Sequence, residues 1–269
     1  MLKFLSIIAI VVIVLAVFFA VAYLCSQALQ KESILIDVNK GLNIKVAHIS
    51  DLHFPYNGIS TDEISDILNE NKPDVIVLTG DIVDGSVDRQ NIDKIGTFFK
   101  NIAQISPCYA VIGNHEIGLD DLDYYVEFTK KCGINVLLND TVFFYKDGKR
   151  VALCGLSDAY KYNAEVVNNY NQINDTDLKI LLAHRPELIS QYLTSSKQPD
   201  VIFCGHAHGG FFRIGKLALY SPNQGLFPKY TSGLYPVESS YLVVSRGLGN
   251  SGIDYRGFNK YHLIFANIQ

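Results

Sequence analysis

The chain has 269 residues, of which 48% are hydrophobic and 19% are charged, and its formal net charge is −4. This composition is typical of a folded protein and excludes a long disordered chain. The slight negative charge provides no basic surface, so we expect no nucleic-acid partner. Five cysteines without a Cys-x-x-Cys pair favour buried free thiols over disulfides or a thiolate metal site.

The first element is an almost uninterrupted apolar run over residues 4–25. A helix of about 20 apolar residues spans the hydrocarbon core of a bilayer, so residues 1–25 are predicted to form a transmembrane anchor. A cleaved signal peptide is the alternative, because Ala20 and Ala22 resemble a cleavage site, but the run exceeds the roughly 7–15 apolar residues of a signal sequence. Lys3 favours a cytoplasmic amino terminus, which would make this a single-pass membrane protein with an extracytoplasmic catalytic domain.

The rest of the chain divides into a polar linker, predicted over residues 26–42, and one folded domain, predicted over residues 43–269. Short apolar runs predict strands near 43–50, 74–79, 108–112, 134–138, 142–146, 150–155, 178–183, 200–204, 241–245 and 261–267. Helical periodicity predicts helices over 61–71, 90–104, 119–131 and 186–194. The alternation of β and α segments indicates a layered α/β domain, and the late consecutive strands indicate a second sheet packed on the first.

Local signals support these elements. Ser60 or Thr61 is placed to cap the first helix of the domain, and Asp147-Gly148 favours the positive φ angles of a tight hairpin turn.

Five of the apolar runs end in residues of the types that bind metal ions. In chain order these are Asp51-x-His53, Gly80-Asp81, Gly113-Asn114-His115-Glu116, His184, and Gly205-His206-Ala207-His208. Parallel strands deliver their carboxyl ends to one edge of a sheet, so these side chains are expected to converge. Each motif alone has an ordinary structural interpretation, such as a turn Asp or a surface His. Together, their oxygen and nitrogen donors predict a site for Mn, Fe, Co or Zn and hydrolysis of a phosphate ester.

The series D-x-H, G-D, G-N-H-E, a single His and G-H-x-H resembles the motifs of the calcineurin-like metallophosphoesterases. The resemblance implies a four-layer α/β/β/α sandwich of two mixed sheets, with two divalent metal ions. It implies seven metal ligands, namely Asp51, His53 and His208 for one ion, Asn114, His184 and His206 for the other, and Asp81 as the bridge between them. It also implies that His115 protonates or hydrogen-bonds the leaving group.

These features predict a membrane-anchored phosphoesterase that hydrolyses a phosphate monoester, a diester or a pyrophosphate with metal-activated water.

The Arg that follows G-D in the protein phosphatases of the superfamily is absent after Asp81. Residues 205–259 resemble the membrane-associated bacterial branch that is similar to UDP-2,3-diacylglucosamine hydrolases. The aromatic-rich stretch 211–235 suggests an apolar wall for a lipid-linked substrate, with ordinary packing as the alternative. A catalytically inactive or nucleotide-sensing scaffold of the same fold is the rival hypothesis.

Several further residues are expected to support the centre without binding metal. These are the acidic neighbours Asp84 and Glu116, which would orient histidines or cap turns, and the strand histidines His48 and His262. Arg246 and Arg256 lie in glycine-rich segments that could fold back to bind a phosphate, and a surface ion pair is the alternative.

Overall fold

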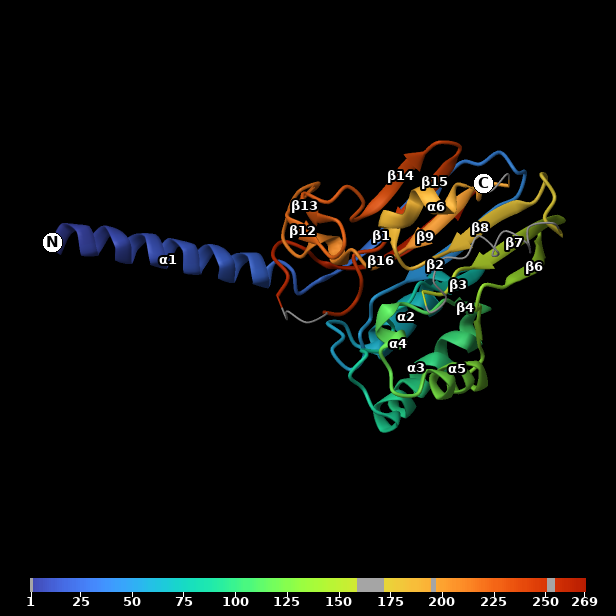
Figure 1. Ribbon diagram of the computed structural model, residues 1–269, viewed down its shortest axis with the longest axis horizontal. Helices are drawn as coiled ribbons and strands as arrows, with labels where there is room; N and C mark the ends of the chain where they lie inside the picture. The colour runs from blue at the N-terminus through green and yellow to red at the C-terminus, as the bar shows by residue number, and fades with distance from the viewer. Residues whose placement is uncertain (1, 159–171, 195–196, 251–254) are drawn as a thin grey trace.

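The computed structural model describes residues 2–158, 172–194, 197–250 and 255–269 (Figure 1). A long helix, α1 (Leu2–Leu24), projects from a domain built around two six-stranded sheets. The first sheet has the order β1 (Leu29–Ile36), β16 (Tyr261–Ile268), β2 (Ile44–Ile49), β3 (Val75–Leu78), β4 (Cys108–Ala110) and β5 (Ile134–Val136). The second has the order β14 (Gly233–Val237), β15 (Ser240–Val244), β9 (Val201–Cys204), β8 (Leu178–Leu182), β7 (Lys149–Gly155) and β6 (Thr141–Lys146).

Both sheets are mixed, and each has a parallel centre. Strands β2, β3, β4 and β5 run parallel, while β16 is antiparallel to β2 and parallel to β1. In the second sheet β15, β9, β8 and β7 run parallel, and the edge strands β14 and β6 are antiparallel to their neighbours. The parallel centres matter for function, because they place the carboxyl ends of five strands on one side of the molecule.

Helices cover the outer faces of the paired sheets. On the first sheet lie α2 (Thr61–Asn71), α3 (Arg89–Ile105), the short α4 (Asn114–Ile117) and α5 (Leu122–Lys131). Their apolar faces pack on it in one core cluster that contains Leu68 and Phe99. A second cluster, with Val77 and Phe203, joins the two sheets, and a third packs the turn η2 (Pro186–Leu188) and α6 (Ile189–Tyr192) on the second sheet. The predicted α/β/β/α sandwich is therefore confirmed.

Local sequence signals act as expected. The Ser60 hydroxyl accepts the backbone N–H of Glu63 at 3.1 Å and so caps α2. Asp147 and Gly148 have φ angles of 51° and 72° in the turn between β6 and β7. The cysteines of the domain, Cys108, Cys132, Cys154 and Cys204, are buried free thiols.

The segment predicted as a linker over residues 26–42 contains strand β1, so that interpretation is wrong for Leu29–Ile36. The strand pairs with β16 along its whole length, from Leu29 opposite Tyr261 to Ile36 opposite Ile268. It lies at the edge of the sheet, where polar side chains stay in solvent and only residues such as Ile34 and Ile36 are buried. An edge strand buries few of its side chains, so its sequence can be as polar as that of a connector.

Candidate metal centre

The seven predicted ligands meet where the carboxyl ends of the two sheets face each other. They follow β2, β3, β4, β8 and β9 and come from both sheets. Among the described residues, three groups have ligand atoms within 4.8 Å of one another, and two of them consist of predicted ligands. These two are Asp51 with His53 and His208, and Asp81 with His184 and His206; the third is His53 with Asp84 and His115. Asn114 joins the second group, because its Oδ1 lies 3.1 Å from Nε2 of His184.

Within the first group, two imidazole nitrogens and a carboxylate oxygen lie close together. Nε2 of His53 lies 3.2 Å from Nε2 of His208, and the latter lies 3.5 Å from Oδ1 of Asp51. All three residues are buried. Two imidazole nitrogens and a carboxylate oxygen directed at one buried point are a donor set that fits a divalent metal ion.

In the second group, the orientation of the His184 ring is fixed from outside. Nδ1 of His184 lies 2.8 Å from the carbonyl oxygen of Thr79, which can only accept, so Nδ1 carries a hydrogen and Nε2 is the atom directed to the centre. That Nε2 lies 3.1 Å from Nδ1 of His206 and 3.1 Å from Oδ2 of Asp81.

The Asp81 carboxylate lies between the two groups. Its Oδ2 is 3.1 Å from Nε2 of His184 and 3.9 Å from Nε2 of His53. Its Oδ1 accepts the backbone N–H of His115 at 2.8 Å, which fixes the plane of the carboxylate. The buried site therefore has one anion placed to serve both halves.

The electrostatic environment shifts the pKa values of two imidazoles at the centre in opposite directions. Burial, helped by the charges of His184 and Arg185, lowers the pKa of His206 to about 2. Burial also lowers the tendency of His184 to be charged, but the Asp81 carboxylate outweighs it and raises the pKa of His184 to about 10. The field that would hold a proton at His184 attracts a cation equally, so the donors present fit a metal ion.

Five of the seven residues have left-handed backbone conformations. The φ angles are 48° at Asp51, 48° at His53, 53° at Asp81, 62° at His206 and 45° at His208. Such conformations cost on the order of 1 kcal/mol or more each for non-glycine residues. The surrounding fold enforces them, and they turn the side chains back toward the common point just after the strands end.

The glycines in the motifs permit close approach. A Cβ atom on Gly205 would lie 1.9 Å from Oγ of Ser50 and 2.2 Å from Oδ2 of Asp51. A Cβ atom on Gly113 would lie 2.4 Å from Oδ1 of Asp81. Each glycine thus makes room for a ligand that comes from another strand end.

Glu116 ties two of the loops together. Its buried carboxylate accepts the backbone N–H groups of Asp81 at 2.8 Å, Ile82 at 2.6 Å, Val83 at 3.1 Å and Gly113 at 2.9 Å. These are charge-assisted bonds that fix the loops after β3 and β4. The expected orienting role of Glu116 is therefore seen in its contacts, directed at backbone and not at a histidine.

A chain of hydroxyl groups connects the buried His48 to the predicted ligand Asp51. Nε2 of His48 lies 2.8 Å from Oγ1 of Thr79, which donates to Oγ of Ser50 at 2.8 Å, and that hydroxyl donates to Oδ2 of Asp51 at 2.6 Å. Burial lowers the pKa of His48 to about 3, so this histidine is neutral and orients the Asp51 carboxylate through the chain.

His115 lies at the edge of the centre, with its ring centroid 4.4 Å from that of His53. Its Nδ1 is 3.2 Å from the backbone N–H of Gly85 and 3.1 Å from Oδ2 of Asp84. When the ring is charged, both nitrogens carry a hydrogen, so Nδ1 can donate to Asp84 and Nε2 is a hydrogen-bond donor.

Four residues around His206 were not predicted. Asn223 places its side-chain amide 2.9 Å from Nε2 of His206, Arg185 places Nη1 3.2 Å away, and Glu187 places Oε1 3.7 Å away. Asp158 in turn holds Nε of Arg185 at 2.7 Å. Arg185 directly follows a predicted ligand and could have been found for that reason, but only the fold brings Asn223 here.

The two arginines proposed to reach the site differ. Arg256 is buried, with Nη2 3.5 Å from Nδ1 of His208, whereas Arg246 bonds to Ser232 and Gln30 away from the ligands.

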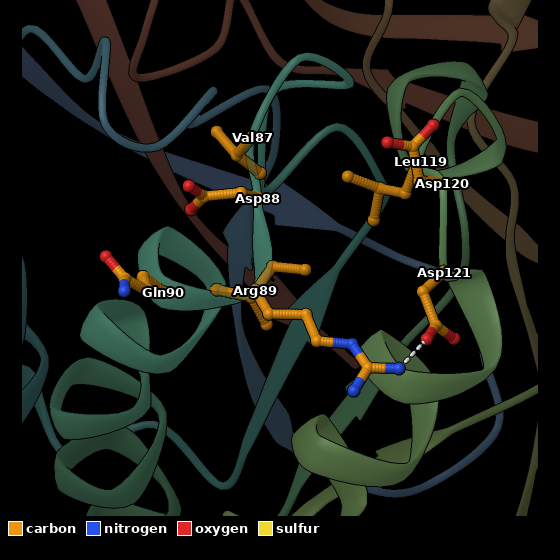
Figure 2. Close-up of a pocket in the computed structure, with 8 residues that line it drawn as sticks. Val87, Asp88, Arg89, Gln90, Leu119, Asp120 and Asp121 are labelled. Atoms are coloured by element: carbon orange, nitrogen blue, oxygen red, sulfur yellow. Dashed lines mark hydrogen bonds and ion pairs between the residues drawn. The ribbon is translucent and has the colours of Figure 1, made fainter.

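A separate hollow of about 540 Å³ lies on the helical side, between residues 87–92 and 119–121, and contains none of the predicted site residues (Figure 2). Arg89 and Asp121 form an ion pair across it.

The fold and the grouped ligands define a metal-dependent hydrolase of phosphoric esters. Comparison with known proteins specifies the family. Residues 44–210 match the calcineurin-like phosphoesterase family, which is well over half of the chain, so the protein belongs to that family.

Its relatives extend across bacteria. The chain is 25% identical over 254 residues to the uncharacterized metallophosphoesterase YkoQ of Bacillus subtilis, covering 88% of this chain and 89% of that protein. It is 26% identical over 215 residues to the phosphodiesterase YaeI of Escherichia coli, covering 77% and 75%. The solved structure of the NAD nucleotidase of Haemophilus influenzae aligns with a TM-score of 0.52 at 17% identity, covering 77% of this chain and 46% of that one, which shows a shared fold.

Proposed function

We propose that this protein is a membrane-anchored phosphoesterase that holds two divalent metal ions and cleaves a phosphate monoester, a diester or a pyrophosphate with metal-activated water. The observation that supports this most directly is the position of the Asp81 carboxylate between two groups of ligand atoms. In this proposal Asp51, His53 and His208 would hold one ion, Asn114, His184 and His206 would hold the other, and Asp81 would serve both.

When bound, two such ions supply Lewis acidity toward the phosphate oxygens and lower the pKa of a water molecule toward neutrality. The protein's own groups do the remaining work. His115 is placed to donate the hydrogen on Nε2 to the leaving oxygen, while Asp84 and the Gly85 N–H hold its Nδ1 edge. Glu116 keeps the loops of Asp81 and Asn114 in place during turnover.

The membrane part of the proposal depends on α1. The stretch Lys3–Leu24 has 22 residues and is long and apolar enough to cross a bilayer. We place the amino terminus in the cytoplasm and the catalytic domain outside, since Lys3 precedes the apolar run. Protease treatment of intact cells tests this orientation, because full protection of the domain would reverse it.

Metal content and turnover of the purified full chain in detergent test the catalytic part. The wild-type protein should bind two Mn²⁺ per chain and hydrolyse aryl phosphate esters, and chelation should abolish turnover. Asp81→Ala should abolish turnover and reduce the metal content of a folded protein, whereas Asp66→Ala, which removes an exposed carboxylate from α2, should change neither. Full activity in Asp81→Ala would contradict the bridging role. A folded wild-type protein without metal or turnover would favour the scaffold hypothesis.

The finer part of the proposal is a lipid-linked substrate. The aromatic-rich stretch 211–235 begins beside the candidate metal centre, where Phe211 stacks on the ring of His208 with centroids 5.8 Å apart. Acyl-bearing pyrophosphates should therefore have a higher kcat/KM than acyl-free pyrophosphates with the same leaving group. Equal values would remove the lipid linkage but leave the phosphoesterase intact.

A further inference from the structure

An exposed apolar rim stands out on the described part of the domain. Among the described residues outside α1 and this rim, the only exposed large hydrophobic residues are Leu35, Tyr56, Ile117 and Tyr145. The rim gathers six within fourteen residues, and its members, with their exposed fractions, are Ile214 (64%), Leu217 (58%), Leu219 (47%), Tyr220 (47%), Leu226 (69%) and Phe227 (63%). Contiguous exposed apolar surface of this kind marks an interaction site.

The rim is carried by two short hairpins close to the membrane helix. The hairpins are β10 (Arg213–Ile214) with β11 (Leu217–Ala218), and β12 (Tyr220–Ser221) with β13 (Gly225–Leu226). Figure 1 shows β12 and β13 beside the end of α1 at which the helix meets the domain, on the side from which the helix projects. A bilayer crossed by α1 would therefore face the rim.

The helix is joined to the domain without a flexible spacer. Ala22 is fully buried, and its carbonyl accepts the backbone N–H of Phe258 at 2.9 Å. The Ser26 hydroxyl accepts the backbone N–H of Asn259 at 2.9 Å, and the Tyr255 hydroxyl donates to the carbonyl of Phe19 at 3.0 Å.

Aromatic contacts strengthen this joint between the end of α1 and the domain. The rings of Phe18 and Phe19 pack on Phe212, and Tyr23 stacks on Tyr255 with centroids 6.0 Å apart. Tyrosine rings at the end of a membrane helix are typical of the bilayer interface. The joint therefore fixes both the depth of the domain and the direction in which the rim faces.

We propose that the apolar rim inserts into the interfacial layer of the same bilayer that α1 crosses; this inference rests on the membrane-anchor part of the proposed function. The partner is the lipid surface itself. Leu226 and Phe227 are of the side-chain types that enter the acyl boundary of an interface. Two exposed lysines, Lys216 in the turn between β10 and β11 and Lys229 just after the rim, can meet anionic headgroups.

The rim is continuous with the metal centre. Tyr220, a member of the rim, stacks on Phe211 with centroids 6.3 Å apart, and Phe211 stacks on His208. Asn223, in the turn between β12 and β13, reaches Nε2 of His206 at 2.9 Å. Insertion of the rim therefore holds the metal centre at the membrane surface, within reach of the phosphate groups of amphiphilic molecules.

The absence of tryptophan from the chain permits a direct test. Single-tryptophan variants of the full chain are reconstituted in vesicles of phosphatidylcholine and phosphatidylglycerol, with and without brominated acyl chains. The rim is probed by Leu226→Trp and Ile214→Trp. The matched control is Tyr145→Trp, an equally exposed position (73%) on β6 at the far end of the domain.

Brominated lipid should quench both rim tryptophans several-fold more than Trp introduced at position 145, and their emission should shift to the blue. Equal, weak quenching at all three positions would overturn the proposal. Leu15→Trp, within α1, tests the membrane anchor separately. If this tryptophan is not quenched, α1 does not cross the bilayer and the anchor proposal is wrong. If it is quenched but the rim tryptophans are not, only the insertion of the rim is rejected. No readout depends on catalysis, so loss of the phosphoesterase proposal would be detected independently.

Discussion

The carboxylate of Glu116 provides a sharp test of how the centre is held together. It accepts four backbone N–H groups from the loops that carry Asp81 and Asn114. In Glu116→Ala these donors lose their partner inside the protein. A buried donor left unsatisfied costs about 1–3 kcal/mol, and water entering the space of the lost side chain would keep each cost near the lower limit. Four donors then give a loss of roughly 4 kcal/mol in the free energy of unfolding.

For a domain of this size, about 1 kcal/mol shifts the melting temperature by roughly 2–4 °C, so Glu116→Ala should melt roughly 8–16 °C below the wild type. Differential scanning calorimetry of the full chain in detergent, with chelator present, measures this without a contribution from bound metal. Glu70→Ala, which removes an exposed carboxylate from α2, is the control and should leave the melting temperature unchanged. A shift of less than about 3 °C in Glu116→Ala would refute the view that this carboxylate fixes the two loops.

Three further outcomes are expected. Burial lowers the pKa of His262 from 6.5 to about 4, so between these pH values the unfolded state binds a proton at this residue and the folded state does not. The free energy of unfolding should therefore fall by about 3 kcal/mol as the pH falls through this window. In His262→Gln, the melting temperature should depend less on pH over the same range. His115→Gln should lower kcat about 10²–10⁴-fold for alkyl phosphates and much less for nitrophenyl phosphates, whose leaving group needs no proton; equal losses would contradict the acid role. Asn223→Ala should weaken Mn²⁺ binding about 10–100-fold in chelator competition, while Lys216→Ala on the neighbouring hairpin should not; unchanged affinity in Asn223→Ala would show that Asn223 does not orient His206.

The central strands and the grouping of the ligand motifs could be predicted because their signals are local. Runs such as Val75–Leu78 and Val201–Cys204 are apolar throughout, as strands buried on both faces must be, and each is followed by glycine and metal-binding residue types. The edge strand Leu29–Ile36 escaped prediction because its stability comes from pairing with β16, more than two hundred residues away in the chain.

The residues that hold the predicted ligands in place also divide into those with a local sequence signal and those that only the fold brings together. The Glu116 carboxylate could be suspected from its place in the G-N-H-E motif, but its acceptance of N–H groups from Asp81, Ile82 and Val83 depends on how β3 and β4 lie side by side. Asn223 carries no sequence signal, because an asparagine in a Pro-Asn-Gln turn is ordinary, and only the hairpin that holds it brings it to His206.

The order of Asp, Asn and His after successive apolar runs determined the family and the kind of chemistry, since ligand type and strand-end position are properties of short segments. Tertiary structure alone decided the distances between the predicted ligands, the left-handed backbone at five of these seven residues, and the contacts that hold the end of α1 on the domain. The reason is physical: residue type sets which atoms can bind a cation, but the packing of two sheets and their loops sets whether those atoms meet and which way the site faces.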